Sequence, residues 1–260
     1  MGYERLYNAA LKRDERADFV AYMNEGQQAR PANMENIVAI NQGRLQEPMA
    51  DPQAPLLSTE AVAQRVDEGH LVLDAREEDD FGAGHIAGAF NVQVTSGQFE
   101  QRVGWVLPAD EPFILVAEDK AAAREALHKL TFVGLDRRVA GILERGMQGW
   151  TEAGLPTRSV PQMTAQELRE AIGQGAIQVL DVRSEEEWET GHIPDALNIP
   201  YRELEEQLPG GLNTQAPIVV LCSGGQRSSI AASVLLRNGY EDVRNVTGGM
   251  GAYEALVDAD

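Results

Sequence analysis

Apolar and polar positions follow the same order twice along the chain. Apolar runs of strand length occupy residues 71–73, 113–117, 177–180 and 217–221. The longer runs are apolar at almost every position, which indicates strands buried on both faces, as in a parallel sheet. The pattern around them predicts helices at 61–66, 121–130, 167–172 and 228–236, and further strands at 138–142 and 243–246. Alternating strands and helices predict an α/β fold with two three-layer domains, each a mainly parallel sheet flanked by helices.

The two halves are also related residue by residue. Residues 71–92 read LVLDAREEDDFGAGHIAGAFNV, and residues 178–199 read QVLDVRSEEEWETGHIPDALNI. Asp74 and Asp181 align at an offset of 107 residues. A repeat of that length is a whole domain, so the sequence indicates a tandem duplication.

Proline clusters mark the ends of the repeats. Pro48, Pro52 and Pro55 precede the first repeat, and Pro156 and Pro161 lie between the two. We therefore divide the chain into an N-terminal extension, a first domain and a second domain, at residues 1–50, 51–158 and 159–260. The extension matches neither repeat and predicts short helices at 16–24 and 34–40.

Composition and charge reduce the number of functions that the chain could have. The formal net charge is −19, which argues against nucleic acid and membrane surfaces as partners. There is one cysteine, and the four histidines have no metal-ligand spacing, so we expect no metal and no other cofactor. No apolar segment has the length of a signal peptide or a membrane span, so we expect a cytoplasmic protein.

One segment carries chemistry. Residues 221–229 read LCSGGQRSS and lie between a predicted strand and a predicted helix. Glycines let the backbone curl into an anion-binding nest, and the positive end of the helix stabilises a thiolate. A buried structural cysteine would explain neither the glycines nor the arginine. We assign Cys222 as the catalytic nucleophile and the residues after it as substrate-binding: Ser223, Gly224, Gly225, Gln226, Arg227 and Ser228.

These residues resemble a known family. Asp181-Val-Arg183, Glu187-Trp188, Gly191-His-Ile-Pro-Asp-Ala-Leu-Asn-Ile-Pro200 and Cys222-x-x-Gly-x-Arg227-Ser228 together resemble the rhodanese sulfurtransferases. The resemblance implies that Cys222 takes a sulfane sulfur from thiosulfate or a persulfide and holds it as a persulfide. The sulfur then passes to cyanide or a thiol. We expect Asp181 and Arg183 to support the site as a charged pair at the sheet edge.

The first repeat departs from this pattern. Aligned through its buried strand, Glu118 occupies the position of Cys222, in a loop that reads EDKAAAR. The loop has neither a thiol nor a glycine, and its two acids would repel an anion. We therefore expect the first rhodanese-like domain to be catalytically inactive. His85 and His192 occupy equivalent positions in the two repeats. A histidine present in both repeats favours a structural role.

Other functions remain open. The protein could be a non-catalytic sulfur relay or a redox sensor that uses Cys222. Some phosphatases and arsenate reductases share the rhodanese fold and rank below these alternatives. Four residues separate Cys222 from Arg227, whereas the phosphatase loop has five.

The extension has its own resemblance. Gly2–Asn8 and Arg30–Asn41 look like the tail of the metallo-β-lactamase-fold part of hydrolase–rhodanese fusion proteins. The metal motif of that fold, His-x-His-x-Asp-His, is absent, so metal hydrolysis is not implied. The resemblance suggests two alternatives. The chain is a fragment or a split product of such a fusion, and if it is split, a separate metallo-β-lactamase-fold protein is expected as a partner. Alternatively, the tail is kept as a strap across the rhodanese pair.

Overall fold

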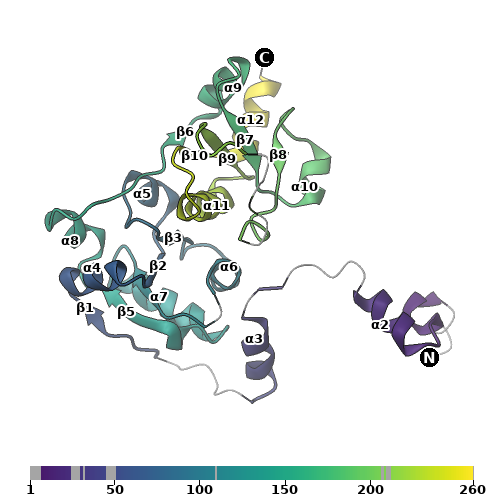
Figure 1. Ribbon diagram of the computed structural model, residues 1–260, viewed down its shortest axis with the longest axis horizontal. Coiled ribbons are helices and arrows are strands. Elements are labelled where there is room, and N and C mark those ends of the chain that lie inside the picture. Colours follow the sequence, from purple (N-terminus) through teal and green to yellow (C-terminus); the bar gives the residue numbers. More distant parts are fainter. Residues whose placement is uncertain are drawn as a thin grey trace. The chain divides into compact units, whose positions relative to one another are not determined.

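The computed structural model describes residues 7–24, 30–31, 33–44, 51–108, 110–205, 208 and 212–259 (Figure 1). The chain separates into two compact units, Met1–Arg30 and Pro31–Asp260. The first unit contains η1 (Ala9–Lys12) and α2 (Arg16–Asn24). The helix expected at 16–24 is confirmed, whereas Gly2–Leu6 of the tail-like segment lies outside the described residues. No helix in the described ranges is both long enough and apolar enough to span a bilayer.

The second unit holds both repeats. The first repeat is a parallel sheet of five strands in the order β1-β5-β4-β2-β3. Its elements are β1 (Leu56–Leu57), α4 (Thr59–Asp67), β2 (Leu71–Asp74), α5 (Glu78–Ala83), β3 (Phe90–Asn91), α6 (Phe99–Val106), β4 (Phe113–Val116), α7 (Lys120–Thr131), η2 (Asp136–Arg138), β5 (Val139–Leu143) and α8 (Gly146–Glu152).

The second repeat has the equivalent strand order, β6-β10-β9-β7-β8, and is also parallel. Its elements are β6 (Gln162–Met163), α9 (Ala165–Gly173), β7 (Gln178–Asp181), α10 (Glu185–Thr190), β8 (Leu197–Asn198), β9 (Ile218–Leu221), α11 (Gln226–Arg237), β10 (Val243–Val246) and α12 (Gly249–Asp258). The predicted fold class, two α/β domains with parallel sheets, is therefore confirmed.

The central strand β9 divides its side chains between two cores. Val219 and Leu221 pack into a smaller core on the side of α9 and α12. Ile218 and Val220 face the opposite way and join a larger core that includes α11 and the whole first repeat. Because side chains alternate along a strand, Cys222 points to the same side as Val220. The cysteine thus faces the side of the sheet that the first repeat covers.

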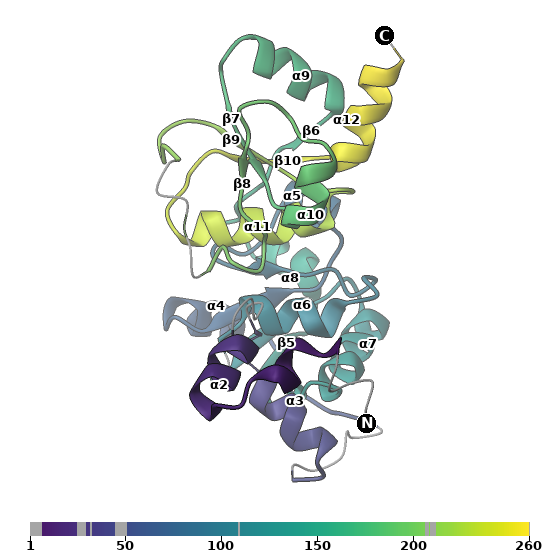
Figure 2. The ribbon, with the colours of Figure 1, turned by 90° about the vertical axis from the view of Figure 1, so that its right-hand side faces the viewer.

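Helix α11 lies between the two repeats in both views (Figures 1 and 2). Ser229 Oγ donates to Asn91 Oδ1 of β3 at 2.6 Å, and Asn91 N donates to Ser233 Oγ at 3.1 Å. All three residues are almost completely buried. Arg237 Nη1 donates to the Gly88 carbonyl, and its guanidinium lies 4.5 Å from the Phe90 ring centroid. One face of α11 therefore covers the second sheet, while the other face forms the junction with the first repeat.

The helix α3 (Met34–Asn41), predicted at 34–40, packs against the first repeat. Asn33 is buried, and its Nδ2 donates to the Val133 carbonyl at 3.3 Å. A Cβ on Gly134 would lie 3.1 Å from Ile40 Cδ1. This part of the N-terminal extension is therefore ordered by contacts with the first repeat.

The hydrogen bond between Ser229 and Asn91 predicts measurable coupling between the repeats. Ser229→Ala removes a buried donor, so we expect a loss of about 1 kcal/mol in the free energy of unfolding. A double-mutant cycle of Ser229→Ala with Asn91→Ala, followed by denaturant unfolding, should give a coupling energy of at least about 0.5 kcal/mol. The control cycle pairs Ser229→Ala with Asn198→Ala, whose amide binds carbonyls of its own repeat. Equal coupling in both cycles would contradict the prediction.

Candidate active site

The loop between β9 and α11 contains the predicted nucleophile. Cys222 is the first residue after β9 and is only 1% exposed. Ser223 and Gly224 lie exposed above it, and Gly225 is buried again. The sulfur therefore sits at the bottom of a short loop at the carboxyl end of the central strand, where open parallel sheets bind ligands.

Two donors point at the sulfur. The Gly225 N–H donates to Cys222 Sγ at 3.1 Å, and the Ser228 hydroxyl lies 3.4 Å from it. Gly225 has φ +112°, which is the reason for glycine there. Gly225 is the N-cap of α11, and no side chain caps this helix end. The field of the helix end and the N–H of Gly225 both stabilise a thiolate.

The two serines after Arg227 have different partners. Ser228 and Ser229 belong to the first turn of α11 and do not cap it. Ser228 Oγ is also 2.9 Å from the Gly225 carbonyl, so its single proton can serve either the sulfur or that oxygen. Ser229 instead binds the first repeat.

The start of α12, at Gly249, contacts the backbone of the cysteine loop. The Met250 N–H donates to the Cys222 carbonyl at 2.7 Å, and the Gly251 N–H donates to the Ser223 carbonyl at 3.2 Å. A Cβ on Gly249 would lie 2.1 Å from the Cys222 carbonyl oxygen, and its φ is +54°. The start of α12 can therefore approach the loop this closely only with glycine at position 249.

Arg227 is held by an acid that the sequence analysis did not assign to the site. Its Nη1 and Nη2 donate to the two carboxylate oxygens of Glu187 at 2.6 and 2.7 Å, and Nη2 also donates to Ser223 Oγ at 2.8 Å. The hydrogen bonds from Arg227, with those from Ser184, lower the pKa of Glu187 to about 2. The same ion pair raises the pKa of Arg227.

The sequence does contain a signal for the position of the Glu187 side chain. Ser184-x-x-Glu187 is a capping box, and the structure forms it in full at the start of α10. That motif fixes the position of the carboxylate on α10. The partner, however, lies 40 residues further along the chain, and only the fold brings α10 to α11.

The predicted supporting pair lies beside the loop. Asp181 is paired through β7 with Leu221, the residue before Cys222. Arg183 forms three side-chain hydrogen bonds with the Asp181 carboxylate and donates to the Gly191 carbonyl at 2.7 Å. Both side chains are buried, so each charge is compensated inside the protein. Asp74 and Arg76 repeat the arrangement in the first repeat, at a matching distance of 2.7 Å.

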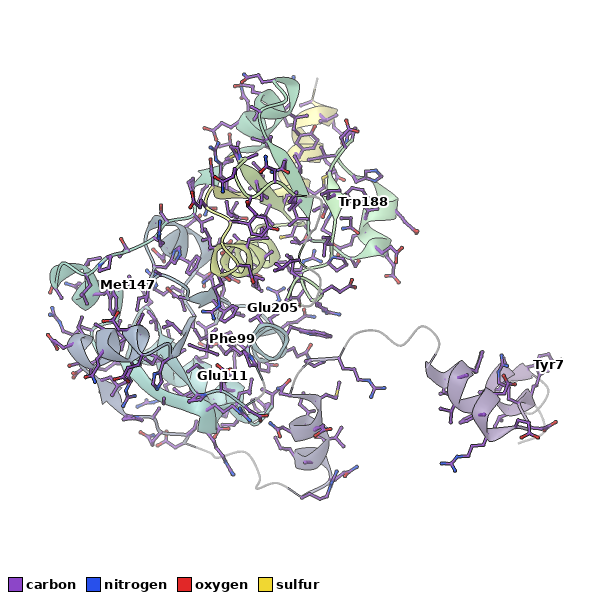
Figure 3. The ribbon with its side chains drawn as sticks, viewed as in Figure 1. Tyr7, Phe99, Glu111, Met147, Trp188 and Glu205 are labelled. Atoms are coloured by element: carbon purple, nitrogen blue, oxygen red, sulfur yellow. The ribbon has the colours of Figure 1, made fainter. Side chains whose placement is uncertain are left out.

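The two histidines stack on aromatic rings. His85 lies 3.8 Å from Phe81 between ring centroids, and His192 lies 3.8 Å from Trp188 on α10 (Figure 3). In each case Nδ1 bonds to the backbone carbonyl of that aromatic residue. Burial lowers the pKa of His85. The same packing in both repeats fits the structural role expected for these histidines.

The strand register corrects one detail of the sequence comparison. Asp74 pairs with Val116, whereas Asp181 pairs with Leu221. The residue that corresponds to Cys222 is therefore Ala117, not Glu118. The first loop, 117–119, has three residues between strand and helix, whereas 222–225 has four. The alignment by sequence took the apolar run 113–117 as the strand, whereas β4 ends at Val116, so it placed the start of the loop one residue too late.

The N-terminal end of α7, in the first repeat, carries a side-chain cap. Asp119 is the N-cap of α7, and its carboxylate accepts from the Ala122 N–H at 2.8 Å. The equivalent helix of the second repeat, α11, has no side-chain cap, whereas a carboxylate caps α7.

A comparison with family models now places the chain. The model described as the Rhodanese-like domain matches residues 58–153 and 164–256. The chain belongs to the rhodanese-like domain family. The two matched segments fall inside residues 51–158 and 159–260, while the exact boundaries between the rhodanese-like domains remain predictions.

Individual relatives carry several different names. The chain is 34% identical over 98 residues to thiosulfate sulfurtransferase GlpE of Pseudomonas savastanoi pv. phaseolicola, covering 38% of this chain and 88% of that protein. It is 33% identical over 93 residues to the putative sulfur carrier protein YrkF of Bacillus subtilis, covering 35% of this chain and only half of that protein. It is 29% identical over 103 residues to a tRNA uridine(34) hydroxylase of Photorhabdus laumondii, covering 38% of this chain and 29% of that protein. Sulfurtransferases are thus among its relatives.

The contact at Gly249 predicts a sharp effect of a single methyl group. Gly249→Ala should displace the Cys222 loop and cost at least about 1–2 kcal/mol of unfolding free energy from the backbone conformation alone. The matched control is Gly251→Ala, whose Cβ would meet the Ser223 carbonyl oxygen at an ordinary 3.4 Å. Denaturant unfolding and the rate of Cys222 alkylation measure both effects. Equal behaviour of the two variants would contradict the predicted role of Gly249.

The Glu187–Arg227 pair predicts acid sensitivity. Because the folded-state pKa of Glu187 is depressed from 4.5 to about 2, the pair stabilises the protein above pH 4.5. That contribution should be lost as pH falls from about 4.5 through 2. Glu187→Gln should therefore flatten the dependence of stability on pH in this window. Glu186→Gln removes the same charge from the same helix as a control, and a similar flattening there would exclude a specific effect of the pair.

Proposed function

We propose that this protein is a sulfurtransferase that moves a sulfane sulfur from thiosulfate or a persulfide to a thiol or to cyanide. The observation that carries the proposal is the environment of Cys222 Sγ. The sulfur accepts the Gly225 N–H at the start of α11, a helix of 12 residues with no capping side chain. A thiolate is the form of cysteine that attacks sulfur, and this position stabilises it.

The first half-reaction forms a persulfide on Cys222. The thiolate attacks the outer sulfur of the donor, a new S–S bond forms, and the old one breaks. Its electron pair leaves with sulfite when the donor is thiosulfate, or with a thiolate when the donor is a persulfide. The loop from Ser223 to Ser228 would hold the anionic donor and the charged persulfide through its backbone N–H groups.

The second half-reaction returns the enzyme to its starting state. Cyanide or an acceptor thiolate attacks the outer sulfur of the Cys222 persulfide. The S–S bond breaks, and its electron pair returns to Sγ as the thiolate. Nucleophilic catalysis thus divides the transfer into two displacements at one sulfur.

The second repeat would be the active one. Ala117 occupies the position of the nucleophile in the first repeat, and alanine cannot carry sulfur. Asp119 places a carboxylate on the end of α7 and would repel an anion there. We therefore propose that the first repeat is catalytically inactive and that Cys222 is the nucleophile of the whole chain.

A sulfur relay is the second candidate, because one relative is named a putative sulfur carrier protein. A relay would hold the same Cys222 persulfide but pass it to one partner. Incubation with excess thiosulfate and cyanide separates the two functions. An enzyme forms many equivalents of thiocyanate, whereas a relay without turnover, or a redox sensor, forms at most one.

A phosphatase or arsenate reductase has less support. The loop has four residues between Cys222 and Arg227, a size suited to a smaller group than phosphate. The Arg227 guanidinium is also engaged by Glu187, so its donors are not aimed at a phosphate site.

The N-terminal extension leaves a proposal about partners. Both matched segments begin after residue 57, so the resemblance of the extension to a metallo-β-lactamase-fold tail is untested by them. The contacts of α3 with the first repeat support the strap interpretation for residues 33–44. A metallo-β-lactamase-fold partner stays a proposal, to be addressed by copurification with and without residues 1–30.

Replacing the nucleophile tests the proposed function. Cys222→Ser should abolish thiocyanate formation, by at least about 10³-fold, because a hydroxyl at this position is a far weaker nucleophile than a thiolate. Intact mass of the wild type after thiosulfate should show one added sulfur, and the variant should show none. The unfolding free energy should change little, which separates lost chemistry from lost folding. If the serine variant still turns over, Cys222 is not the nucleophile of the whole chain, and the first repeat can no longer be regarded as inactive.

A further inference from the structure

The first repeat reaches the Cys222 loop with two charged side chains. Arg102 of α6 donates through Nη1 to Gln226 Oε1 at 3.1 Å, across 124 residues of sequence. Glu78 of α5 lies with Oε1 3.5 Å from where a Cβ on Gly225 would be. Helix α6 also carries Phe99, which is fully buried in the core of the first repeat (Figure 3). Arg102 is therefore anchored on a packed helix and aimed at the loop of the other repeat.

The arginine within the loop is already neutralised. Arg227 forms a bidentate pair with Glu187, so the two together carry no net charge. Arg202 lies at the junction as well, with its guanidinium 5.2 Å from the Trp105 ring centroid and 5.7 Å from that of Tyr201. Its Nε also donates to the Tyr201 hydroxyl at 3.3 Å, and it has no ion-pair partner among the described residues.

Arg102 forms no ion pair with any of the described residues. Within the described part of the chain, its side chain makes one hydrogen bond, to neutral Gln226, and has no ion-pair partner. Its Nε is shielded from solvent and also has no hydrogen-bond partner among the described residues. Burial lowers the pKa of Arg102, while Tyr201 and Cys222 raise it and Arg227 and Arg202 lower it further.

Glu78 opposes this positive charge only in part. Its Oε2 is buried without a hydrogen-bond partner among the described residues, and burial raises the pKa of its carboxyl. The raised pKa favours the neutral form of Glu78 relative to an exposed glutamate. The first repeat therefore brings a guanidinium and a carboxyl group to the loop, and among the described residues the two form no ion pair.

We propose that Arg102, from the repeat without a cysteine, is the anion-binding residue of the Cys222 site and selects small sulfur oxyanions as donors. This inference rests on the proposed function. A guanidinium matches the geometry of an oxyanion and would hold the sulfonate oxygens of thiosulfate. Cys222 then attacks the outer sulfur, and the sulfite that leaves with the S–S electron pair stays beside the same positive charge. Neutral donors gain nothing from this contact.

The first test needs no sulfurtransferase activity. Iodoacetate and iodoacetamide alkylate a thiol by the same chemistry but differ in charge, and Cys222 is the one cysteine of the chain. The ratio of their rate constants at Cys222 should fall about fivefold or more in Arg102→Gln. Arg102→Lys keeps the charge and should recover much of the ratio. The control Arg138→Gln removes a charge from the same repeat at an exposed pair with Asp110 and should leave the ratio unchanged.

The second test measures sulfur loading. The thiosulfate concentration that half-saturates persulfide formation should rise about tenfold in Arg102→Gln, with a nearly unchanged maximal rate. An unchanged iodoacetate ratio and half-saturation in a folded variant would overturn the role of Arg102. If the wild type shows the charge-dependent ratio but accepts sulfur from no donor, the proposed function fails and the anion site stands. Resistance of wild-type Cys222 to both alkylating reagents would overturn both.

Discussion

The double burial of α11 is the constraint on which this molecule depends. Its first residues carry the cysteine loop, one face covers the second sheet, and the other face meets the first repeat. Ser229 and Ser233 on that second face are buried against Asn91, so their hydrogen-bonding groups must find partners across the junction. Any movement of α11 would therefore disturb the junction and the sulfur environment together. The repeat without a thiol therefore contributes contacts to the helix that follows the cysteine loop.

The loops at equivalent positions in the two repeats differ in length and in how the following helix begins. Both follow a central buried strand and precede a helix of 12 residues. In the second repeat, Gly225 turns the chain through a positive φ and caps the helix without a side chain. In the first repeat, the loop is one residue shorter and Asp119 fills the helix end with a carboxylate. The same fold therefore directs a helix-end N–H at Cys222 Sγ in one copy and caps the equivalent helix with a carboxylate in the other.

The ion pair beside the cysteine loop has a structural role. The bidentate contact between Glu187 and Arg227 fixes α10 against the loop, and it cancels the charge of the arginine nearest the cysteine. Positive charge for a ligand must then come from elsewhere, and α6 of the first repeat carries Arg102 to Gln226. A chain with a net charge of −19 would otherwise offer an anion little attraction. The local arrangement of arginines opposes the overall field over the few ångströms where screening is weak.

The sequence by itself determined the duplication, the parallel α/β class, and the loop from Cys222 to Ser228, because these depend on local apolar runs, glycines and caps that repeat along the chain. It also located the Asp181–Arg183 pair, whose members are two residues apart. Only the tertiary structure decided that Ala117 corresponds to Cys222, since strand register and a shortened loop set that equivalence. It alone brought Glu187 to Arg227 and Arg102 to Gln226, 40 and 124 residues away. Such contacts depend on how helices pack over sheets, and no local pattern of side chains encodes that packing.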